Sequence, residues 1–271
     1  MNYWTESNRN IYVAAHRGWP ARYPENTMES FRAAAELGVD QIETDVRITA
    51  DGELVCIHDA TVDRTTDGSG RVDLLTLAEL KALDAGIRKG EEFRGCRIPT
   101  FIEFMDYVSS GSFPSLTLDV ELKEYPTPGH EEIAWSVCDR VLKIIDDYGF
   151  TDRVVINTFA GDLHEYIADK YGAKYRRHVY YPIRNLSDRI TRDPYADGAF
   201  CCCMFSSVSG EIMATKEEFA AMAARGIEPW AGAGVKNEAG VRQAAENGAT
   251  LITCNNPDEI LAILRRMGLH S

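Results

Sequence analysis

The sequence predicts a TIM (β/α)8 barrel, an α/β fold in which a ring of parallel strands is surrounded by helices. Apolar runs typical of strands alternate along the chain with segments typical of helices, and this alternation favours a parallel sheet with crossover helices. The 271 residues are close to the roughly 250 that such barrels commonly occupy as one unit. A hydrophobic content of 45% is enough for a sizeable core. We therefore expect a single domain over residues 1–271.

Nine segments have the character of strands, although the barrel needs only eight. They are short apolar runs bounded by turn residues, as expected for buried parallel strands. The pattern leaves open which one is short, distorted or outside the barrel, and two late segments, Tyr175–Tyr181 and Phe200–Ser206, are candidates. The nine segments are Ile11–Ala15, Gln41–Ile48, Leu54–His58, Ser115–Leu122, Arg153–Thr158, Tyr175–Tyr181, Phe200–Ser206, Gly226–Ala231 and Ala249–Cys254.

Helix signals lie between these strands. Asn26 precedes an amphipathic run that ends at Gly38, and Glu29 follows the expected cap, an arrangement typical of a capping box with a C-terminal glycine. Similar reasoning predicts helices over Glu131–Tyr148, Lys216–Arg225 and Glu238–Asn247.

A long segment separates the third strand candidate from the fourth. Residues from about 60–113 have little strand character, but Leu77, Leu80 and Leu83 repeat with helical spacing, so part of the segment is expected to pack. We interpret it as a small insertion after the third strand, combined with the helix that follows.

The residues that carry chemistry stand at or near the ends of predicted strands. His16 follows the first run and His58 ends the third, while Glu43 and Asp45 lie in the second and Glu121 in the fourth. Barrel enzymes keep their active sites at the carboxyl ends of the strands, so these side chains are expected to converge. Two histidines can divide the roles of general acid and general base, because their ordinary pKa lies near neutrality.

Three carboxylates are expected to form a metal site. Glu43 and Asp45 share one face of their strand, because successive side chains alternate between faces. Such a pair would repel unless a cation lay between them. Together with Glu121 they make an all-oxygen set that suits Mg²⁺ or Ca²⁺ better than zinc, without choosing between the two. Lys123 shares the face of Glu121 and adds a fixed positive charge, so the pattern predicts metal-assisted hydrolysis of a phosphate ester.

At these positions the chain resembles the glycerophosphodiester phosphodiesterase family, within the phospholipase C-like phosphodiesterases that use a TIM barrel. The resemblance runs in family order from about residue 11 to residue 160, with weaker similarity to the C-terminus. The ordered set is more specific than any single motif. The matching stretches are His16-Arg17-Gly18, Pro24–Thr27 with Phe31 and Ala34, Gly38–Val46, Asp51–Val55 leading to His58-Asp59, Asp63–Thr66 with Gly68 and Gly70, Ile98–Thr100 with Glu103, Glu121–Lys123, and Asn157–Phe159.

The resemblance implies an activity, the metal-dependent hydrolysis of glycerophosphodiesters to glycerol 3-phosphate and an alcohol. In the family scheme the free 2-hydroxyl of the glycerol attacks phosphorus, and water then opens the resulting cyclic phosphate. One histidine removes a proton while the other protonates the departing alcohol. The implied roles are acid–base catalysis for His16 and His58, phosphate binding for Arg17 and Lys123, and binding of one divalent cation, Mg²⁺ or Ca²⁺, for Glu43, Asp45 and Glu121.

Two aromatic residues, Phe159 and Trp230, are expected to wall the substrate pocket, with a packing role in the core as the alternative for Phe159. In the family the strand of the tryptophan commonly carries Trp-Thr-Val-Asn, whereas small residues follow Trp230 here. The family's terminal Thr-Asp-x-Pro or Thr-Asn-x-Pro appears as Cys254-Asn-Asn-Pro257. The insertion of the family lies over the mouth of the barrel, so we expect the segment of about 60–113 to set which alcohol is accepted.

The remaining histidines and the cysteines are interpreted as structural. Cys201, Cys202 and Cys203 point alternately to opposite faces of a strand and cannot chelate one metal together, so we expect them to be buried. Seven cysteines in apolar segments fit a reducing compartment better than a disulfide framework. The histidines without a partner motif, expected to be structural or solvated, are His130, His164, His178 and His270.

Charge and hydropathy restrict the partners. A net charge of −13 and a pI near 5.0 oppose binding to nucleic acid, which normally requires a basic face. No apolar stretch is long enough to span a bilayer, and Met1–Asn10 is polar and lacks the apolar core of a signal peptide. We expect a cytoplasmic enzyme that acts on a small-molecule phosphodiester; the oligomeric state stays open.

Three alternatives accompany this interpretation. A lysophospholipase D-type phosphodiesterase on the same barrel would need an apolar groove or membrane-facing patch. A non-catalytic binding protein is disfavoured, because none of the residues implied in catalysis has been replaced. An isomerase or aldolase-type barrel would explain the fold but not the two histidines. The insertion residues that could supply the apolar groove are Phe101, Phe104, Met105 and Phe113.

Overall fold

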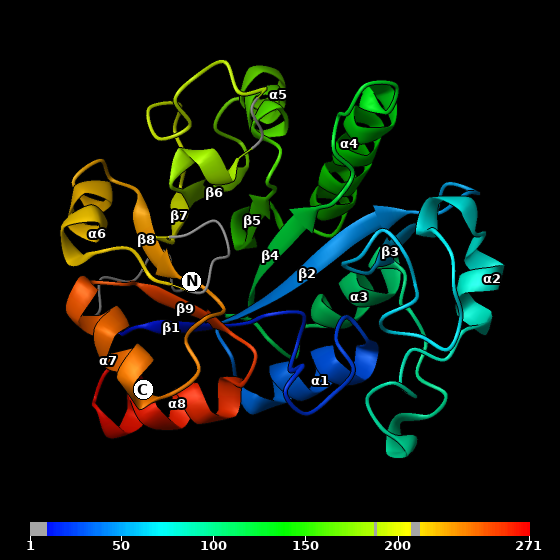
Figure 1. The fold of residues 1–271 in the computed structure, drawn as a ribbon, viewed down its shortest axis with the longest axis horizontal. Coiled ribbons are helices and arrows are strands. Elements are labelled where there is room, and N and C mark those ends of the chain that lie inside the picture. The colour runs from blue at the N-terminus through cyan, green and yellow to red at the C-terminus, as the bar shows by residue number, and fades with distance from the viewer. Residues whose placement is uncertain (1–9, 187–188, 207–211) are drawn as a thin grey trace.

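The predicted barrel is confirmed in the computed structural model, which describes residues 10–186, 189–206 and 212–271 (Figure 1). Residues 1–9, most of the polar segment Met1–Asn10 that was found to lack a signal-peptide core, lie outside the described part of the chain. Parallel strands close into a ring because β1 pairs with both β2 and β9. In ring order the strands are β1 (Tyr12–Ala15), β2 (Gln41–Ile48), β4 (Thr117–Leu122), β5 (Val154–Asn157), β6 (Arg176–Tyr181), β7 (Cys201–Met204), β8 (Glu228–Ala231) and β9 (Leu251–Cys254).

The strand outside the barrel is β3 (Leu54–Cys56), which was not among the two candidates. It pairs antiparallel with the outer end of β2, where Val46 faces Cys56 and Ile48 faces Leu54. β4 pairs with β2 only as far as Val46, so β2 projects past the ring and the chain turns back onto its free end. β6 and β7, the two segments proposed as exceptions, are ordinary barrel strands with parallel neighbours on both sides.

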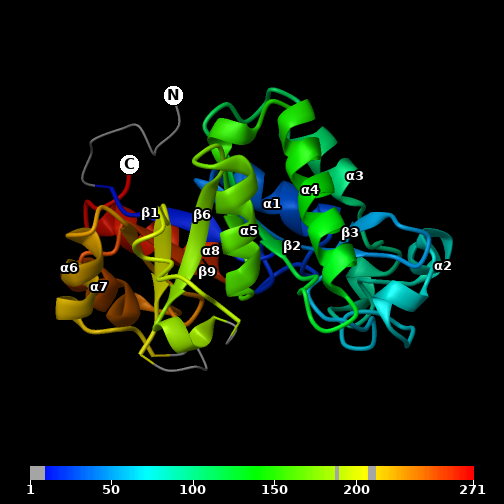
Figure 2. The same cartoon turned by 90° about the horizontal axis from the view of Figure 1, so that it is seen from above.

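Amphipathic helices form the outer layer (Figures 1 and 2). α1 is capped by the Thr27 side chain, which accepts from the Ser30 amide, and ends at Gly38 in the left-handed region. Thr27 thus takes the capping position predicted for Asn26. The outer helices are α1 (Met28–Leu37), α3 (Phe101–Val108), α4 (Glu131–Asp147), α5 (Gly161–Tyr171), α6 (Lys216–Ala223), α7 (Glu238–Asn247) and α8 (Pro257–Arg266), with short 3-10 turns at Thr151–Arg153 and Ile183–Asn185.

The insertion lies between β3 and α3 and extends from one side of the barrel, where Figure 2 shows α2 (Leu77–Ala82). It also contains 3-10 turns at Val72–Leu74 and Glu91–Phe93. A small core of its own holds it together, formed by Val55, Ile57, Val62, Val72, Leu80, Ala85 and Ile98.

The apolar groove considered for a lipid substrate is not formed by α3. Phe101, Phe104 and Met105 are fully buried in the layer between the helices and the strands, and Phe113 packs against the same layer. These residues stabilise the barrel wall, because α3 is the helix that joins β2 and β3 to β4. Among the described residues, no helix has both the length and the apolar character needed to cross a membrane.

The barrel has a second core inside the ring. Alternate residues of each strand point inward, and those of the lower layers fill the interior with Ala14, Val155, Cys201, Trp230 and Leu251. Cys202, on the opposite face, belongs to the helix–strand layer, so the alternation expected for the cysteine triplet is confirmed. Above this plug, the inward residues become polar, and there the pocket begins.

Candidate active site

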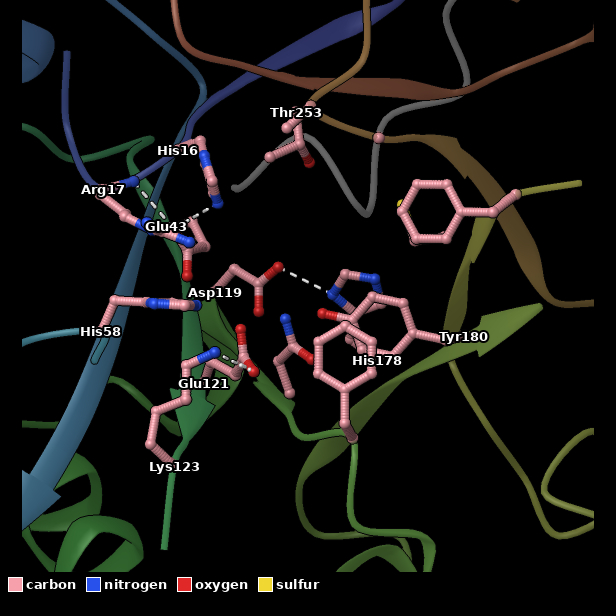
Figure 3. A pocket seen from close by; sticks show the side chains of 16 residues that line it. His16, Arg17, Glu43, His58, Asp119, Glu121, Lys123, His178, Tyr180 and Thr253 are labelled. Carbon is pink, nitrogen blue, oxygen red and sulfur yellow. Dashed lines mark hydrogen bonds and ion pairs between the residues drawn. The ribbon is translucent and has the colours of Figure 1, made fainter. Parts of the chain in front are cut away.

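A pocket of about 190 Å³ lies at the carboxyl ends of the barrel strands (Figure 3). Asp45, which is fully buried, lies directly behind its wall and contacts two of the lining cations. Trp230 is the one predicted site residue that lies elsewhere. The predicted residues that line the pocket are His16, Arg17, Glu43, His58, Glu121, Lys123 and Phe159.

The loop after β1 places the backbone amide and the guanidinium of Arg17 at the pocket. Arg17 and Gly18 have φ values of 57° and 84°, so the chain turns sharply here, and a Cβ on Gly18 would lie 2.3 Å from Ser30 Oγ. The turn brings the Arg17 amide to within 2.8 Å of Glu43 Oε2, to which it donates. The Arg17 guanidinium contacts Asp45, with 3.3 Å between Nε and Oδ2.

His58 reaches the pocket because β3 runs back toward the barrel. The Ile57 amide donates to the Asp45 carbonyl over 3.1 Å, which fixes the approach of the following residue. Arg47 holds the two neighbouring segments together, since its Nε donates to the His58 carbonyl over 2.9 Å and its NH1 to the Lys123 carbonyl over 3.1 Å. The segment that follows β3, a strand outside the ring, thus supplies His58 to the site.

Three carboxylates converge as predicted. Oxygen atoms of Glu43, Asp45 and Glu121 lie within 4.8 Å of one another. Lys123 Nζ donates to Glu121 Oε1 over 2.5 Å and lies 3.2 Å from Asp45 Oδ1. Asn26, whose φ of 53° places it in the left-handed region, donates from its amide to Asp45 Oδ2 over 2.8 Å.

The charges of this cluster do not balance. Burial and the Asp45 charge raise the pKa of Glu43 well above its usual value, and burial also raises the pKa of Glu121. Burial disfavours the ionised form of Asp45 too, but Lys123 and Arg17 outweigh it and hold its pKa below the usual range. Within the described residues Glu43 Oε1 is buried without a hydrogen-bond partner. An all-oxygen set with one negative charge in excess of its two cations fits a hard divalent cation.

The two histidines have different partners at Nδ1. His16 Nδ1 lies 2.7 Å from Oδ1 of Asn255, whereas His58 Nδ1 lies 2.6 Å from a carboxylate oxygen of Asp59. Burial, aided by the Arg17 charge, lowers the pKa of His16 to about 4. Burial and then Lys123 lower the pKa of His58, which Asp59 partly offsets. Figure 3 shows both rings projecting into the pocket beside Glu43.

Arg64 of the insertion links Arg17 to His58 through two carboxylates, Glu25 and Asp59. Its guanidinium donates to Glu25 over 2.7 and 2.8 Å and to Asp59 over 2.6 and 3.1 Å. Glu25 in turn accepts from Arg17 NH1 over 2.9 Å, and Asp59 holds His58. One arginine therefore orients both a phosphate-binding candidate and an acid–base candidate.

Apart from Phe159, the opposite flank of the pocket was not predicted. His178, interpreted above as structural or solvated, lines the pocket and contacts Asp119, with 2.8 Å between Nδ1 and Oδ2. Tyr180 stacks on Phe159 with ring centroids 3.8 Å apart. Period-two alternation from Glu121 would have placed Asp119 inward, but no motif marks the others. The lining residues that sequence reasoning missed are Asp119, Asn157, His178, Tyr180, Cys203, Phe205, Gly232, Ala233 and Thr253.

Comparison with known proteins identifies the family. A profile of the glycerophosphoryl diester phosphodiesterase family matches residues 16–270. The chain belongs to this family. A glycerophosphodiester phosphodiesterase from Caldanaerobacter subterraneus subsp. tengcongensis is 46% identical over 149 residues, which are 54% of this chain and 57% of that protein. Glycerophosphodiester phosphodiesterase 1 of Rattus norvegicus is 36% identical over 160 residues, 54% of this chain and 47% of that protein. The matched regions thus span about half the length of these relatives.

Solved structures show the same fold. A glycerophosphodiester phosphodiesterase from Agrobacterium tumefaciens superposes with a TM-score of 0.74 at 23% identity, covering 93% of this chain and 99% of that one. An Oleispira antarctica phosphodiesterase in complex with the product sn-glycerol-3-phosphate has a TM-score of 0.77 at 22% identity, covering 94% and 96% of the two chains.

In this family member Trp230 does not line the pocket, although the sequence predicted that it would. It is fully buried in the interior plug, one layer below, where its ring lies 4.9 Å from that of His178. Its Nε1 donates to Glu228 Oε2 over 3.2 Å. Strand β8 continues past the tryptophan for one residue before Gly232 reaches the rim, so the lining position falls on a glycine.

The insertion of this family member contacts the rim without lining the main pocket. None of the described residues in 60–113 lines the pocket, and Arg64 stands behind its wall. Ala60, Arg71, Val72 and Asp73 instead line a second pocket of about 360 Å³ that shares Lys123 with the first. A role of the insertion in accepting the alcohol stays a prediction.

Proposed function

We propose that the protein hydrolyses glycerophosphodiesters to glycerol 3-phosphate and an alcohol, with one divalent cation and a pair of histidines. The observation that carries the proposal is the convergence of two histidines, three carboxylates and the charged groups of Arg17 and Lys123 on one pocket. Family membership supports it, as does the Oleispira antarctica phosphodiesterase that binds the product sn-glycerol-3-phosphate.

Glu43, Asp45 and Glu121 would hold the cation, Mg²⁺ or Ca²⁺. When bound, it would supply Lewis-acid polarisation of the phosphate and orientation of the glycerol hydroxyls. Arg17 and Lys123 would bind the non-bridging phosphate oxygens. The charged groups of Arg17 and Lys123 are largely shielded from solvent. A fixed charge in such a place interacts more strongly with the transition state than it would in water.

The partners at Nδ1 suggest how the histidines divide the proton transfers. His16, bonded to a neutral amide and with a pKa of about 4, is the base that accepts the proton of the glycerol 2-hydroxyl as its oxygen attacks phosphorus. His58, beside the Asp59 carboxylate, is better able to carry a proton and gives it to the departing alcohol oxygen. A cyclic phosphate results. Water opens it with the two roles reversed.

One observation favours the lysophospholipase D-type alternative. A pocket of about 480 Å³ adjoins the site at Phe159 and is lined in part by Tyr125, Pro128 and Leu186, so it could accept an apolar chain. The non-catalytic alternative has no such support. The single domain and the cytoplasmic location remain predictions, the latter supported by seven buried cysteines without disulfides.

The test is release of glycerol 3-phosphate from glycerophosphodiesters, and of lysophosphatidic acid from lysophospholipids, by protein that has been stripped with chelator and resupplied with Mg²⁺ or Ca²⁺. Release from the small diesters that depends on added metal is the expected result. Release of lysophosphatidic acid alone would move the assignment to a lipid enzyme. No turnover with either metal would favour a binding protein. His164→Gln, which changes a buried histidine away from the pocket, is the control for damage to the fold.

A further inference from the structure

His178, the aromatic rings beside it and two further lining side chains, Asp119 and Thr253, form a part of the pocket wall, called the flank below, that carries polar atoms without a partner among the described residues. Asp119 Oδ1, His178 Nε2 and Thr253 Oγ1 are buried and make no hydrogen bond within the described residues. The three side chains are 1%, 3% and 7% exposed and come from β4, β6 and β9. Buried polar groups are nearly always paired in native proteins. Three orphaned atoms around one pocket therefore indicate a ligand that supplies their partners.

His178 is held in a fixed orientation. A carboxylate only accepts hydrogen bonds, so the Nδ1–H of His178 donates to Asp119 Oδ2, over 2.8 Å. The imidazole lies between Tyr180 and Trp230, with ring centroids 5.2 and 4.9 Å away. Its tautomer and its position are thus set before a ligand arrives, and Nε2 is left as an acceptor facing the pocket (Figure 3).

The chemistry of the flank matches a polyol. Asp119 Oδ1 and His178 Nε2 accept hydrogen bonds, and the Thr253 hydroxyl can accept or donate, so the ligand must bring donors at separate places. Phe159 and Tyr180 stack at 11° between their planes, and Tyr180 and Phe205 at 15°, which gives a flat apolar surface for a carbon skeleton. Asp119 would repel an anion, and one ammonium group could not reach acceptors on three strands.

We propose that this flank is a polyol subsite and that His178 is its specificity-determining residue. The inference rests on the proposed hydrolysis of phosphodiesters and adds what the second half of the pocket recognises. The polyol has two possible sources, the glycerol that remains on the phosphate or a polyol that leaves as the alcohol. Both bring hydroxyl donors on a short carbon chain.

The experiment compares kcat/KM on diesters that differ by one hydroxyl. Glycerophosphoethanol is set against its analogue that lacks the terminal glycerol hydroxyl but keeps the 2-hydroxyl, and glycerophosphoglycerol against glycerophosphopropane-1,3-diol. In the wild type one of the two pairs is expected to differ by about 100-fold, because losing the hydroxyl leaves buried groups unpaired. The pair that differs identifies the source of the polyol.

His178→Phe keeps a ring between Tyr180 and Trp230 and removes the acceptor. It should lower kcat/KM for the better substrate of the pair by about 100-fold and leave the poorer one unchanged, so that the discrimination disappears. His178→Gln, which retains an acceptor, should recover part of it. Thr253→Val should reduce it less. His164→Phe, at a buried histidine that does not line the pocket, should lower the melting temperature without changing the ratio.

Several results would overturn the subsite. One is a wild type indifferent to both hydroxyl changes, and another is a His178→Phe variant that slows all substrates equally. A preference for glycerophosphoethanolamine over glycerophosphoethanol that is lost in His178→Phe would mark an ammonium site instead. If the wild type cleaves no diester, the proposed function fails separately. Calorimetric binding of the same pairs to chelator-treated protein then decides the subsite, with loss of discrimination in His178→Phe as the expected result.

Discussion

The two flanks of the pocket are built in different ways. On the flank formed by β1, β2, β3 and β4, side chains are positioned by ion pairs and by hydrogen bonds to charged groups. On the flank formed by β6, β7 and β9, with the end of β5 and Asp119 of β4, they are positioned mainly by aromatic stacking and packing, and His178 also by its hydrogen bond to Asp119. In our proposal the first flank moves protons and binds phosphate, whereas the second offers a shaped surface with a few hydrogen-bond acceptors. The comparison teaches that catalysis and substrate selection are assigned here to different sets of residues in one pocket.

The difference extends behind the pocket. The charged flank continues through Glu25 and Asp59 to Arg64, so a segment outside the barrel contributes to its geometry. The aromatic flank continues downward into Trp230 and the interior plug, so its geometry depends on the core. Substitutions in the two regions should therefore fail in different ways, one mainly in turnover and the other mainly in stability or selectivity.

The largest effect is expected on the charged flank. His16→Ala and His58→Ala should each lower kcat by about 10²–10⁴-fold, because a general acid or base is lost, while the melting temperature changes little. Steady-state kinetics with thermal unfolding in parallel would measure both. Phe205→Leu, on the aromatic flank, is the matched comparison and should cost less than about tenfold. Near-normal turnover by either histidine variant would show that its role is wrongly assigned.

Glu43→Gln should lower kcat by about 100-fold or more. The same change should stabilise the metal-free protein. The carboxyl has a higher pKa folded than unfolded, so it contributes stability below about pH 4.5 that is lost as pH rises. In chelator, the variant should therefore melt above the wild type at pH 8, by a margin that shrinks toward pH 5.

Metal binding gives the second measurement on the same variant. Saturating Mg²⁺ or Ca²⁺ should raise the wild-type melting temperature by several degrees, as expected at about 100 times Kd, and the shift should be lost in Glu43→Gln. Glu246→Gln, at an exposed glutamate on α7, is the control. An undiminished metal shift in Glu43→Gln would place the ion elsewhere.

Arg64→Lys should lower kcat by roughly 10-fold, because an ammonium cannot replace two bidentate contacts and small misplacements of reacting groups are costly. Arg64 is the main cause of the lowered pKa of Asp59, which is about 2. Without it, Asp59 would interact more strongly with the His58 imidazolium and raise the pKa of His58. The basic limb of the kcat/KM profile should move to higher pH.

That pH shift separates a positioning role from general damage. Arg242→Lys, at an exposed arginine of α7, should change neither kcat nor the basic limb of the kcat/KM profile. A slower enzyme whose pH profile is unchanged would mean that Arg64 supports the fold of the insertion only.

The charged flank could be predicted from the sequence because its chemistry demands particular residue types at strand ends. Glu43, Asp45 and Glu121 follow from period-two alternation, and no apolar core tolerates them without a partner. The barrel itself followed from the alternation of strands and helices. The error over β3 arose because Leu54–His58 is as apolar as a barrel strand, and composition does not reveal that its neighbour pairing is antiparallel.

The aromatic flank could not be predicted in the same way. Tyr180, Phe205 and Trp230 are ordinary packing residues by type, and one residue of strand length decides whether such a ring lines the pocket or fills the core. His178 lacked a motif because its partner, Asp119, stands on a strand 59 positions away in the sequence. Only the closure of the ring brings the two together.

The smallest effect on turnover is expected for Trp230→Phe. Trp230 is fully buried below the pocket, so the change removes packing and the hydrogen bond to Glu228 and should cost about 1–3 kcal/mol of stability. That corresponds to a melting temperature lower by several degrees, with kcat/KM within about threefold of the wild type. Phe159→Leu, at a residue that does line the pocket, should show the converse, a small change in melting temperature and a larger one in KM. Thermal unfolding and steady-state kinetics on the two variants measure this contrast, and a selective loss of kcat/KM in Trp230→Phe would return the tryptophan to the pocket wall.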